Sequence, residues 1–330
     1  MRKPVCATLA VMMSLLFSPL SQAGQAWESY KARFFKPEGR IVDTGNGDVS
    51  HTEGQGFAML MAVANDDKAT FDKLWQWTNR ELKNKENGLF YWRYNPAESN
   101  PVADKNNAAD GDVLIAWALL KADARWHDKR YSAASDVITK ALVAHSVIRY
   151  AGYRVMLPGV QGFKLDGEVV LNPSYFVFPA WQAFAGRSHL PVWRDLIKDG
   201  KRLLGKMGSG KANLPADWVS LTSDGKLEPA KGWQPRMSYD AIRIPLYLAW
   251  SDKQSPLLTP WKAWFGQFPR EQTPAWVNVT TNEYAPYMME GGLLAVRDLT
   301  MGQPSGEPEI TSKDDYYSAS LKMLVWISAQ

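Results

Sequence analysis

Hydrophobic residues along the chain form two kinds of helical pattern. Three segments are apolar on every side of a helix: Phe57–Ala64, Val113–Leu120 and Ile244–Trp250. Four others carry charges on one face and hydrophobic residues on the other: Asp66–Leu82, Tyr131–His145, Val192–Lys206 and Pro260–Phe268. A helix that is apolar all round must be enclosed by protein, whereas an amphipathic helix can lie at the surface. The pattern therefore predicts enclosed helices covered by surface helices.

Enclosed and surface helices alternate where the pattern is clearest, since 57–64 precedes 66–82 and 113–126 precedes 131–145. This order predicts an all-α protein in which an inner ring of helices is wrapped by an outer ring, an α/α barrel. A plain helix bundle is the alternative, but about ten visible helical segments favour the larger barrel. Segments rich in Gly, Pro and Asn are expected to form the loops of a substrate cleft: 84–107, 151–176 and 269–284.

The N-terminus has the three parts of a secretory signal peptide. Arg2 and Lys3 precede an apolar stretch over residues 7–17, and Ser21-Gln22-Ala23 supplies the small residues of a cleavage site. The apolar stretch is too short to cross a bilayer, which needs about 20 residues. We expect cleavage after Ala23, which would leave residues 24–330 as a single domain without a membrane anchor. The protein is then exported, to the periplasm or to the medium.

Composition narrows the chemistry further. The only cysteine, Cys6, would be lost with the signal peptide, which excludes cysteine nucleophiles, cysteine-bound zinc and disulfides. Lys and Arg total 38 against 34 Asp and Glu with no basic stripe, so nucleic acid is not an expected partner. The chain holds 15 Trp, 13 Tyr and 12 Phe, which could stack on sugar rings in a groove. A monomer is the default expectation.

Carboxylates stand directly before the three enclosed helices. Glu53 precedes the first, Asp110 and Asp112 precede the second, and Asp240 leads into the third. A helix N-terminus stabilises an acid, so each residue alone could be a cap. In a ring of parallel inner helices, however, the N-termini face one end of the barrel and their acids surround one cavity. Flanking glycines are expected to let a ligand approach the backbone: Gly54, Gly56 and Gly111.

The segment Ala108–Ala122 (AADGDVLIAWALLKA), followed by Trp126, closely resembles the signature of glycoside hydrolase family 8. It departs from that signature at Ala109, where the family usually has Ser or Thr. Four more motifs follow the order of the family over nearly the whole mature chain: Thr52-Glu53-Gly54-Gln55, Asn172-Pro173-Ser174-Tyr175, Ser238-Tyr239-Asp240-Ala241-Ile242-Arg243 and Asp315-Tyr316-Tyr317.

This resemblance implies an (α/α)6 barrel that hydrolyses β-1,4-glucan with inversion of configuration and without a cofactor or metal. It makes Glu53 the proton donor and Asp240 the base that holds the attacking water. Asp110 would bind and distort the sugar at the cleavage point, although its equivalent is also described as a nucleophile. Inversion requires the acid and base carboxyls to stand about 6.5–9.5 Å apart. The candidate substrate-binding residues are Asp112, Trp117, Tyr175, Tyr239 and Arg243.

The favoured function is therefore an endo-β-1,4-glucanase, that is, a cellulase. Two alternatives remain at this stage. One is a protein that binds glucan during cellulose handling or export without cutting it, and the other is a chitosanase or xylanase of the same family. The family subgroup with an aspartate at the position of Asp240 is chiefly cellulolytic, which favours glucan as the substrate.

Overall fold

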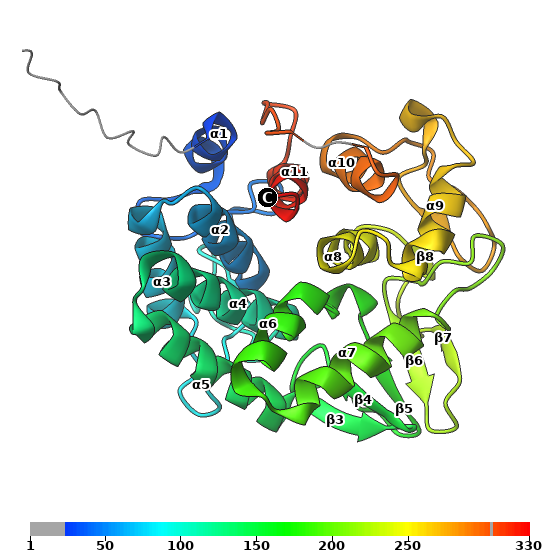
Figure 1. Cartoon of the computed structure of the whole chain (residues 1–330), viewed down its shortest axis with the longest axis horizontal. Coiled ribbons are helices and arrows are strands. Elements are labelled where there is room, and N and C mark those ends of the chain that lie inside the picture. Colours follow the sequence, from blue (N-terminus) through cyan, green and yellow to red (C-terminus); the bar gives the residue numbers. More distant parts are fainter. Residues whose placement is uncertain (1–23, 304–305) are drawn as a thin grey trace, which may run out of the picture.

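Six helices form a closed ring in which each helix contacts the next. The structure is a computed structural model that describes residues 24–303 and 306–330, so the predicted signal peptide lies outside the described residues. In order around the ring (Figure 1), the inner helices are α2 (Thr52–Ala64), α4 (Ala109–Trp126), α6 (Phe178–Ser188), α8 (Arg243–Ser251), α10 (Gly291–Thr300) and α11 (Tyr316–Ser328).

The remaining described α-helices pack on the outside of this ring. They are α1 (Gln25–Phe34), α3 (Lys68–Glu81), α5 (Lys129–His145), α7 (Pro191–Leu204) and α9 (Thr259–Phe265). They pack on α11, α2, α4, α6 and α10, respectively. This arrangement confirms the predicted α/α barrel. No helix of the described residues is long and apolar enough to cross a membrane.

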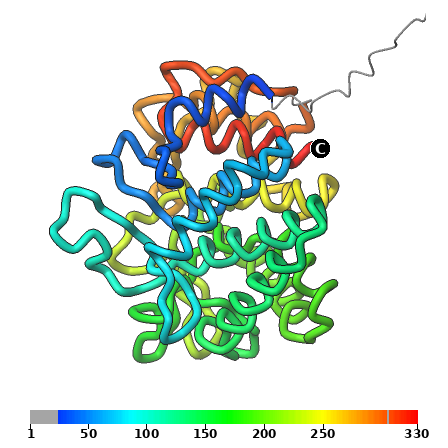
Figure 2. Tube along the Cα trace, turned by 90° about the vertical axis from the view of Figure 1, so that its left-hand side faces the viewer, coloured from blue at the N-terminus to red at the C-terminus, as the bar shows by residue number. Residues whose placement is uncertain are grey.

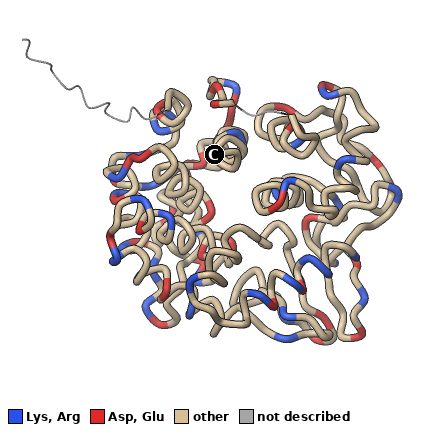
Figure 3. Tube along the Cα trace, in the orientation of Figure 1, with Lys and Arg blue, Asp and Glu red and all other residues tan. Residues whose placement is uncertain are grey.

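Both kinds of helix predicted from the sequence pattern are present in the structure. The three apolar segments lie within α2, α4 and α8, and the four amphipathic ones correspond to α3, α5, α7 and α9. Figure 3 shows charged residues of both signs interspersed over the outer helices. Figure 2, a side view, shows the long loop between α3 and α4 projecting from one end of the barrel.

Short antiparallel strands, which the sequence pattern did not predict, decorate the barrel. A three-stranded sheet has the order β5-β6-β7, and part of it falls in segment 151–176, which we expected to be loop. Its strands are β5 (Glu168–Leu171), β6 (Val219–Thr222) and β7 (Leu227–Pro229). The paired strands elsewhere are β1 (Ser50–His51) with β2 (Arg93–Tyr94), β3 (Val147–Tyr150) with β4 (Tyr153–Met156), and β8 (Arg236–Met237) with β9 (Val277–Asn278).

Close packing of α2 against α4 places the first two acidic motifs side by side. A Cβ atom added at Gly56 would lie 2.5 Å from the Leu114 Cβ, and one added at Gly111 would lie 2.1 Å from the Thr52 Oγ1. Real side chains do not approach so closely, so both positions need glycine for helix contact. This corrects the expectation that these glycines make room for a ligand: they make room for the neighbouring helix.

Candidate active site

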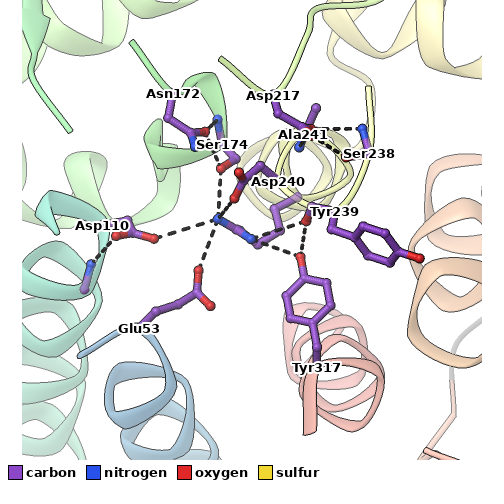
Figure 4. Close-up of polar contacts among 12 residues, drawn as sticks. Glu53, Asp110, Asn172, Ser174, Asp217, Ser238, Tyr239, Asp240, Ala241 and Tyr317 are labelled. Carbon is purple, nitrogen blue, oxygen red and sulfur yellow. Dashed lines mark hydrogen bonds and ion pairs between the residues drawn. The ribbon is translucent and has the colours of Figure 1, made fainter. Parts of the chain in front are cut away.

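Three carboxylates from three inner-helix heads converge on one buried guanidinium (Figure 4). Nη2 of Arg243, in the first turn of α8, lies 3.1 Å from Oε2 of Glu53 and 3.0 Å from Oδ1 of Asp240. The same nitrogen lies 3.8 Å from Oδ2 of Asp110. The structure thus brings together the three acids that the sequence selected from positions 53, 110 and 240.

The orientation of Arg243 is fixed by further hydrogen bonds. Its Nη2 donates to the Ser174 hydroxyl at 2.9 Å, and Nη1 donates to the Tyr317 hydroxyl at 3.0 Å. The Tyr317 hydroxyl in turn donates to the backbone carbonyl of Tyr239, next to Asp240. Ser174 belongs to η1 (Pro173–Tyr175) and Tyr317 to α11. Arg243 therefore links α8, α11 and η1 at the floor of the site.

The three acids differ in their access to solvent. The Glu53 and Asp240 side chains are 19% and 31% exposed, whereas the Asp110 side chain is 4% exposed. Glu53 and Asp240 can therefore meet a ligand and water directly. Asp110 lies beneath them and can reach only a group that enters the site deeply.

Burial and the neighbouring Glu53 carboxylate raise the pKa of Asp110 well above its ordinary value, and Arg243 opposes this shift only in part. Two carboxyl groups that lie this close do not readily ionise together. Burial and the adjacent carboxylate therefore favour the protonated form of Asp110 more than that of an exposed aspartate.

The separation of the acid and base carries information about stereochemistry. The oxygens of Glu53 and Asp240 that contact Arg243 are at most about 6 Å apart, because each lies within 3.1 Å of the same nitrogen. The carboxyl groups of inverting glycosidases stand about 6.5–9.5 Å apart, and those of retaining ones about 5–5.5 Å. This upper limit applies to one pair of oxygens and is compatible with either range, so the anomer of the product is the measurement that assigns the stereochemistry.

Aromatic rings surround this cluster. Trp218 stacks on Phe163 and on Trp233, with ring centroids 5.7 Å and 5.0 Å apart, and meets the ring of Tyr175 edge-on. Beside the acids, Tyr239 is 44% exposed, and a cavity of about 630 Å³ opens next to it between α10 and α11. Flat rings beside an acidic centre suit a substrate made of sugar rings.

A family model described as glycosyl hydrolases family 8 matches residues 1–330. The chain belongs to glycosyl hydrolase family 8. This family 8 enzyme is 61% identical, over 312 residues, to a protein named endoglucanase from Cellulomonas uda; the match covers 94% of this chain and 87% of that protein.

Solved structures of the family agree with this result. Endoglucanase Cel10 of Klebsiella pneumoniae is 66% identical and superposes with a TM-score of 0.92, over 93% of this chain and 99% of that one. An endo-β-1,4-glucanase of family 8 from an Achatina fulica gut metagenomic library also shows 66% identity and a TM-score of 0.92. That match covers 94% of this chain and 99% of the other. The family 8 enzyme is thus a glycoside hydrolase.

Two residues that the sequence selected for substrate binding lie elsewhere. Asp112 is fully buried and accepts hydrogen bonds from the Phe90 N–H at 2.9 Å and from Nδ2 of Asn107 at 2.8 Å. Burial raises the pKa of Asp112 to about 7. It faces away from the cluster and holds the loop between α3 and α4, so its selection for substrate binding is corrected.

Trp117 is the second correction. It follows Asp110 by seven residues and therefore lies about 10 Å further along the helix axis. There it is buried against Trp250 of α8, with ring centroids 4.9 Å apart. Trp117 belongs to the core of the family 8 enzyme. The other selected residues, Tyr175, Tyr239 and Arg243, do lie at the site.

Sequence reasoning missed Asp217 entirely. Its carboxylate accepts hydrogen bonds from the N–H groups of Ser238 and Ala241, at 2.9 Å and 2.8 Å, on either side of Asp240. Asp217 lies 21 residues before Ser238 in a loop without helical periodicity, and no local pattern marks it. Ser174 and Tyr317 fall inside the quoted motifs, but their contacts with Arg243 could not be read from the motifs.

Proposed function

We propose that this protein is an endo-β-1,4-glucanase that cuts internal bonds of cellulose-type glucans with inversion, using Glu53 as proton donor and Asp240 as base. One observation carries the proposal: two solvent-accessible carboxylates from distant parts of the sequence meet at one buried arginine, Arg243, beside exposed aromatic rings. The names of the similar proteins from Cellulomonas uda and Klebsiella pneumoniae support glucan as the substrate.

The proposed reaction is a single displacement. Glu53 gives its proton to the glycosidic oxygen as the bond from that oxygen to the anomeric carbon breaks. Asp240 takes a proton from a water molecule, whose oxygen attacks the anomeric carbon from the opposite face. The products are a chain with a new reducing end of inverted configuration and a chain with a free hydroxyl.

Asp110 has a supporting role in this proposal. It is too deeply buried to act on bulk water, and its burial favours the protonated form. From the floor of the site it can donate a hydrogen bond to a hydroxyl of the sugar at the cleavage point.

Viscosity and product anomers test this function together. The wild-type protein is expected to lower the viscosity of carboxymethylcellulose long before reducing sugar accumulates, which is the signature of endo cleavage. NMR of the first product from a defined cello-oligosaccharide should show the α-anomer. Glu53→Gln should reduce turnover between about 10² and 10⁴-fold, because it removes the proton donor without changing shape.

Other outcomes of this experiment would reject the proposal in distinct ways. Binding to glucan without loss of viscosity would favour a glucan-binding protein. A β-anomer as first product would replace inversion by a covalent intermediate. Higher turnover on chitosan or xylan oligosaccharides than on cello-oligosaccharides would reassign the substrate.

We also propose that residues 1–23 are a signal peptide and that the enzyme acts outside the inner membrane as a single-domain monomer. The basic, apolar and small-residue order at the N-terminus supports export. N-terminal sequencing of protein from the periplasm and medium should begin at Gly24, and gel filtration with light scattering should give the mass of one chain. Protein that keeps Met1 and stays in the cytoplasm would contradict export.

A further inference from the structure

The turn that carries Asp240 is held by a carboxylate from a distant part of the chain. Oδ1 of Asp217 accepts hydrogen bonds from the N–H of Ser238 at 2.9 Å and from the N–H of Ala241 at 2.8 Å. Its Oδ2 accepts a hydrogen bond from the Ser238 hydroxyl (Figure 4). One side chain thus fixes the backbone on both sides of the proposed base.

This carboxylate holds the turn from which α8 begins. The helix starts after Ile242, and no side chain of its own segment caps it. Asp217 supplies the acceptor from the loop before β6, and it is itself fixed because its N–H donates to the Arg236 carbonyl at 2.7 Å. The orientation of Asp240 toward Arg243 therefore depends on Asp217.

Asp217 also places a second negative charge next to Asp240. Burial and the charge of Asp240 raise the pKa of Asp217 to about 6. Ionisable groups from each neighbouring element face Asp240 or its turn: Arg243 of α8, Glu53 of α2, Asp110 of α4, Tyr175 of η1 and Tyr317 of α11. Among these groups Arg243 is the cation, and it forms an ion pair with Asp240.

We propose that Asp217 is a positioning residue for the general base: it fixes the turn that carries Asp240 and thereby aims this carboxylate at the attacking water. The inference rests on the proposed function, in which Asp240 is the base. Loss of the hydrogen bonds that Asp217 accepts should therefore lower kcat far more than it changes KM.

Asp217→Asn tests whether the hydrogen bonds position the base. An asparagine can still accept both N–H groups with its Oδ1, and its amide can donate to the Ser238 oxygen. Its kcat on cello-oligosaccharides should therefore be well above that of Asp217→Ala. Ser238→Ala is the matched control: it removes one hydrogen bond and keeps both N–H contacts with Asp217, so its kcat should stay close to that of the wild type.

Asp217→Ala removes the charge and all three acceptors. Its kcat should fall about 10²-fold, because a base displaced by about 1 Å loses its alignment with the attacking water. KM should change much less than kcat, and near-ultraviolet circular dichroism reports whether the barrel is intact. If this variant fails to fold, Asp217→Ser is measured in its place, because its side chain is too short to reach both N–H groups.

A wild-type kcat in folded Asp217→Ala would overturn the positioning role, and so would a kcat of Asp217→Asn as low as that of Asp217→Ala. Asp240→Asn is measured in parallel to separate these failures from a failure of the proposed function. If Asp240→Asn keeps wild-type turnover, the base is misassigned; if it is inactive while folded Asp217→Ala keeps a wild-type kcat, only the inference about Asp217 fails.

Discussion

The acid side and the base side of the active site hold their carboxylates in different ways. On the acid side, Glu53 and Asp110 stand in the first turns of α2 and α4, and the close contact of those helices brings them together. On the base side, Asp240 stands in a turn before α8, and Asp217 holds that turn from outside. Glu53 and Asp110 are positioned by the helices to which they belong. Asp240 lies in a turn, and that turn is held by a side chain from elsewhere in the chain.

The two sides also differ in their contact with water. Asp110 is buried, which favours its protonated form, while the Asp240 side chain is 31% exposed and open to solvent. A general base needs access to a water molecule, and Asp240 has that access. Arg243 contacts both sides and keeps them at a fixed distance from each other.

Replacing the proposed base, Asp240, should have the largest effect on turnover. Asp240→Asn removes the group that takes the proton from water, so kcat should fall between about 10² and 10⁴-fold on carboxymethylcellulose. The substitution keeps the size of the side chain and can still face Arg243, so the melting temperature should stay near that of the wild type. Normal turnover in a folded Asp240→Asn protein would place the base elsewhere.

Replacing Asp110, which lies beneath the proton donor, should have the next largest effect on turnover. Asp110→Asn keeps the shape but replaces the carboxyl group that is proposed to bind the sugar at the cleavage point, and a small misplacement of that sugar should lower turnover about 10²-fold. Stability gives a second readout. Because the pKa of Asp110 is raised in the folded state, its contribution to the unfolding free energy is fully present at low pH and is lost as the pH rises.

The Asn variant should therefore lose less stability than the wild type as the pH increases. Urea unfolding over a range of pH values measures this difference, with Asp240→Asn as the matched control on the other side of the site. Parallel pH dependences in Asp110→Asn and wild type would show that the pKa of Asp110 is not raised in the folded protein.

The acid side could be predicted from sequence because the signal is local. Glu53 and Asp110 directly precede apolar runs, and in a ring of parallel helices the heads of such runs must meet at one end. Asp240 was found in the same way. Asp217 could not be found, because its role depends on a contact with a turn 21 residues away that no periodicity marks.

The position of a residue along a helix and the direction in which its side chain points were harder to predict than the helix itself. Residues two positions apart on a helix point in different directions, so Asp112 could not share the site of Asp110. Trp117 lies on the proper side of α4, but the pattern does not tell how far the cleft reaches toward the centre of the barrel. The short strands β5, β6 and β7 escaped prediction because three or four residues give no sustained alternation.

The smallest effect on turnover is expected at Asp112, two residues from Asp110 in the same helix. Asp112→Ala leaves the Phe90 N–H and the Asn107 amide without their acceptor in a buried place, which should lower the unfolding free energy by about 2 kcal/mol or more. Because the pKa of Asp112 is about 7 in the folded state, its charge adds a cost as the pH rises through that value.

The loss in Asp112→Ala should accordingly be larger at pH 5 than at pH 8, as measured by urea unfolding. Its kcat should stay close to that of the wild type, since Asp112 faces the loop between α3 and α4 and not the sugar. Asp110→Asn provides the opposite pattern, with low turnover and retained stability. If Asp112→Ala instead lost turnover at full stability, the loop that it holds would have to belong to the catalytic machinery, and the acid side would extend around α4.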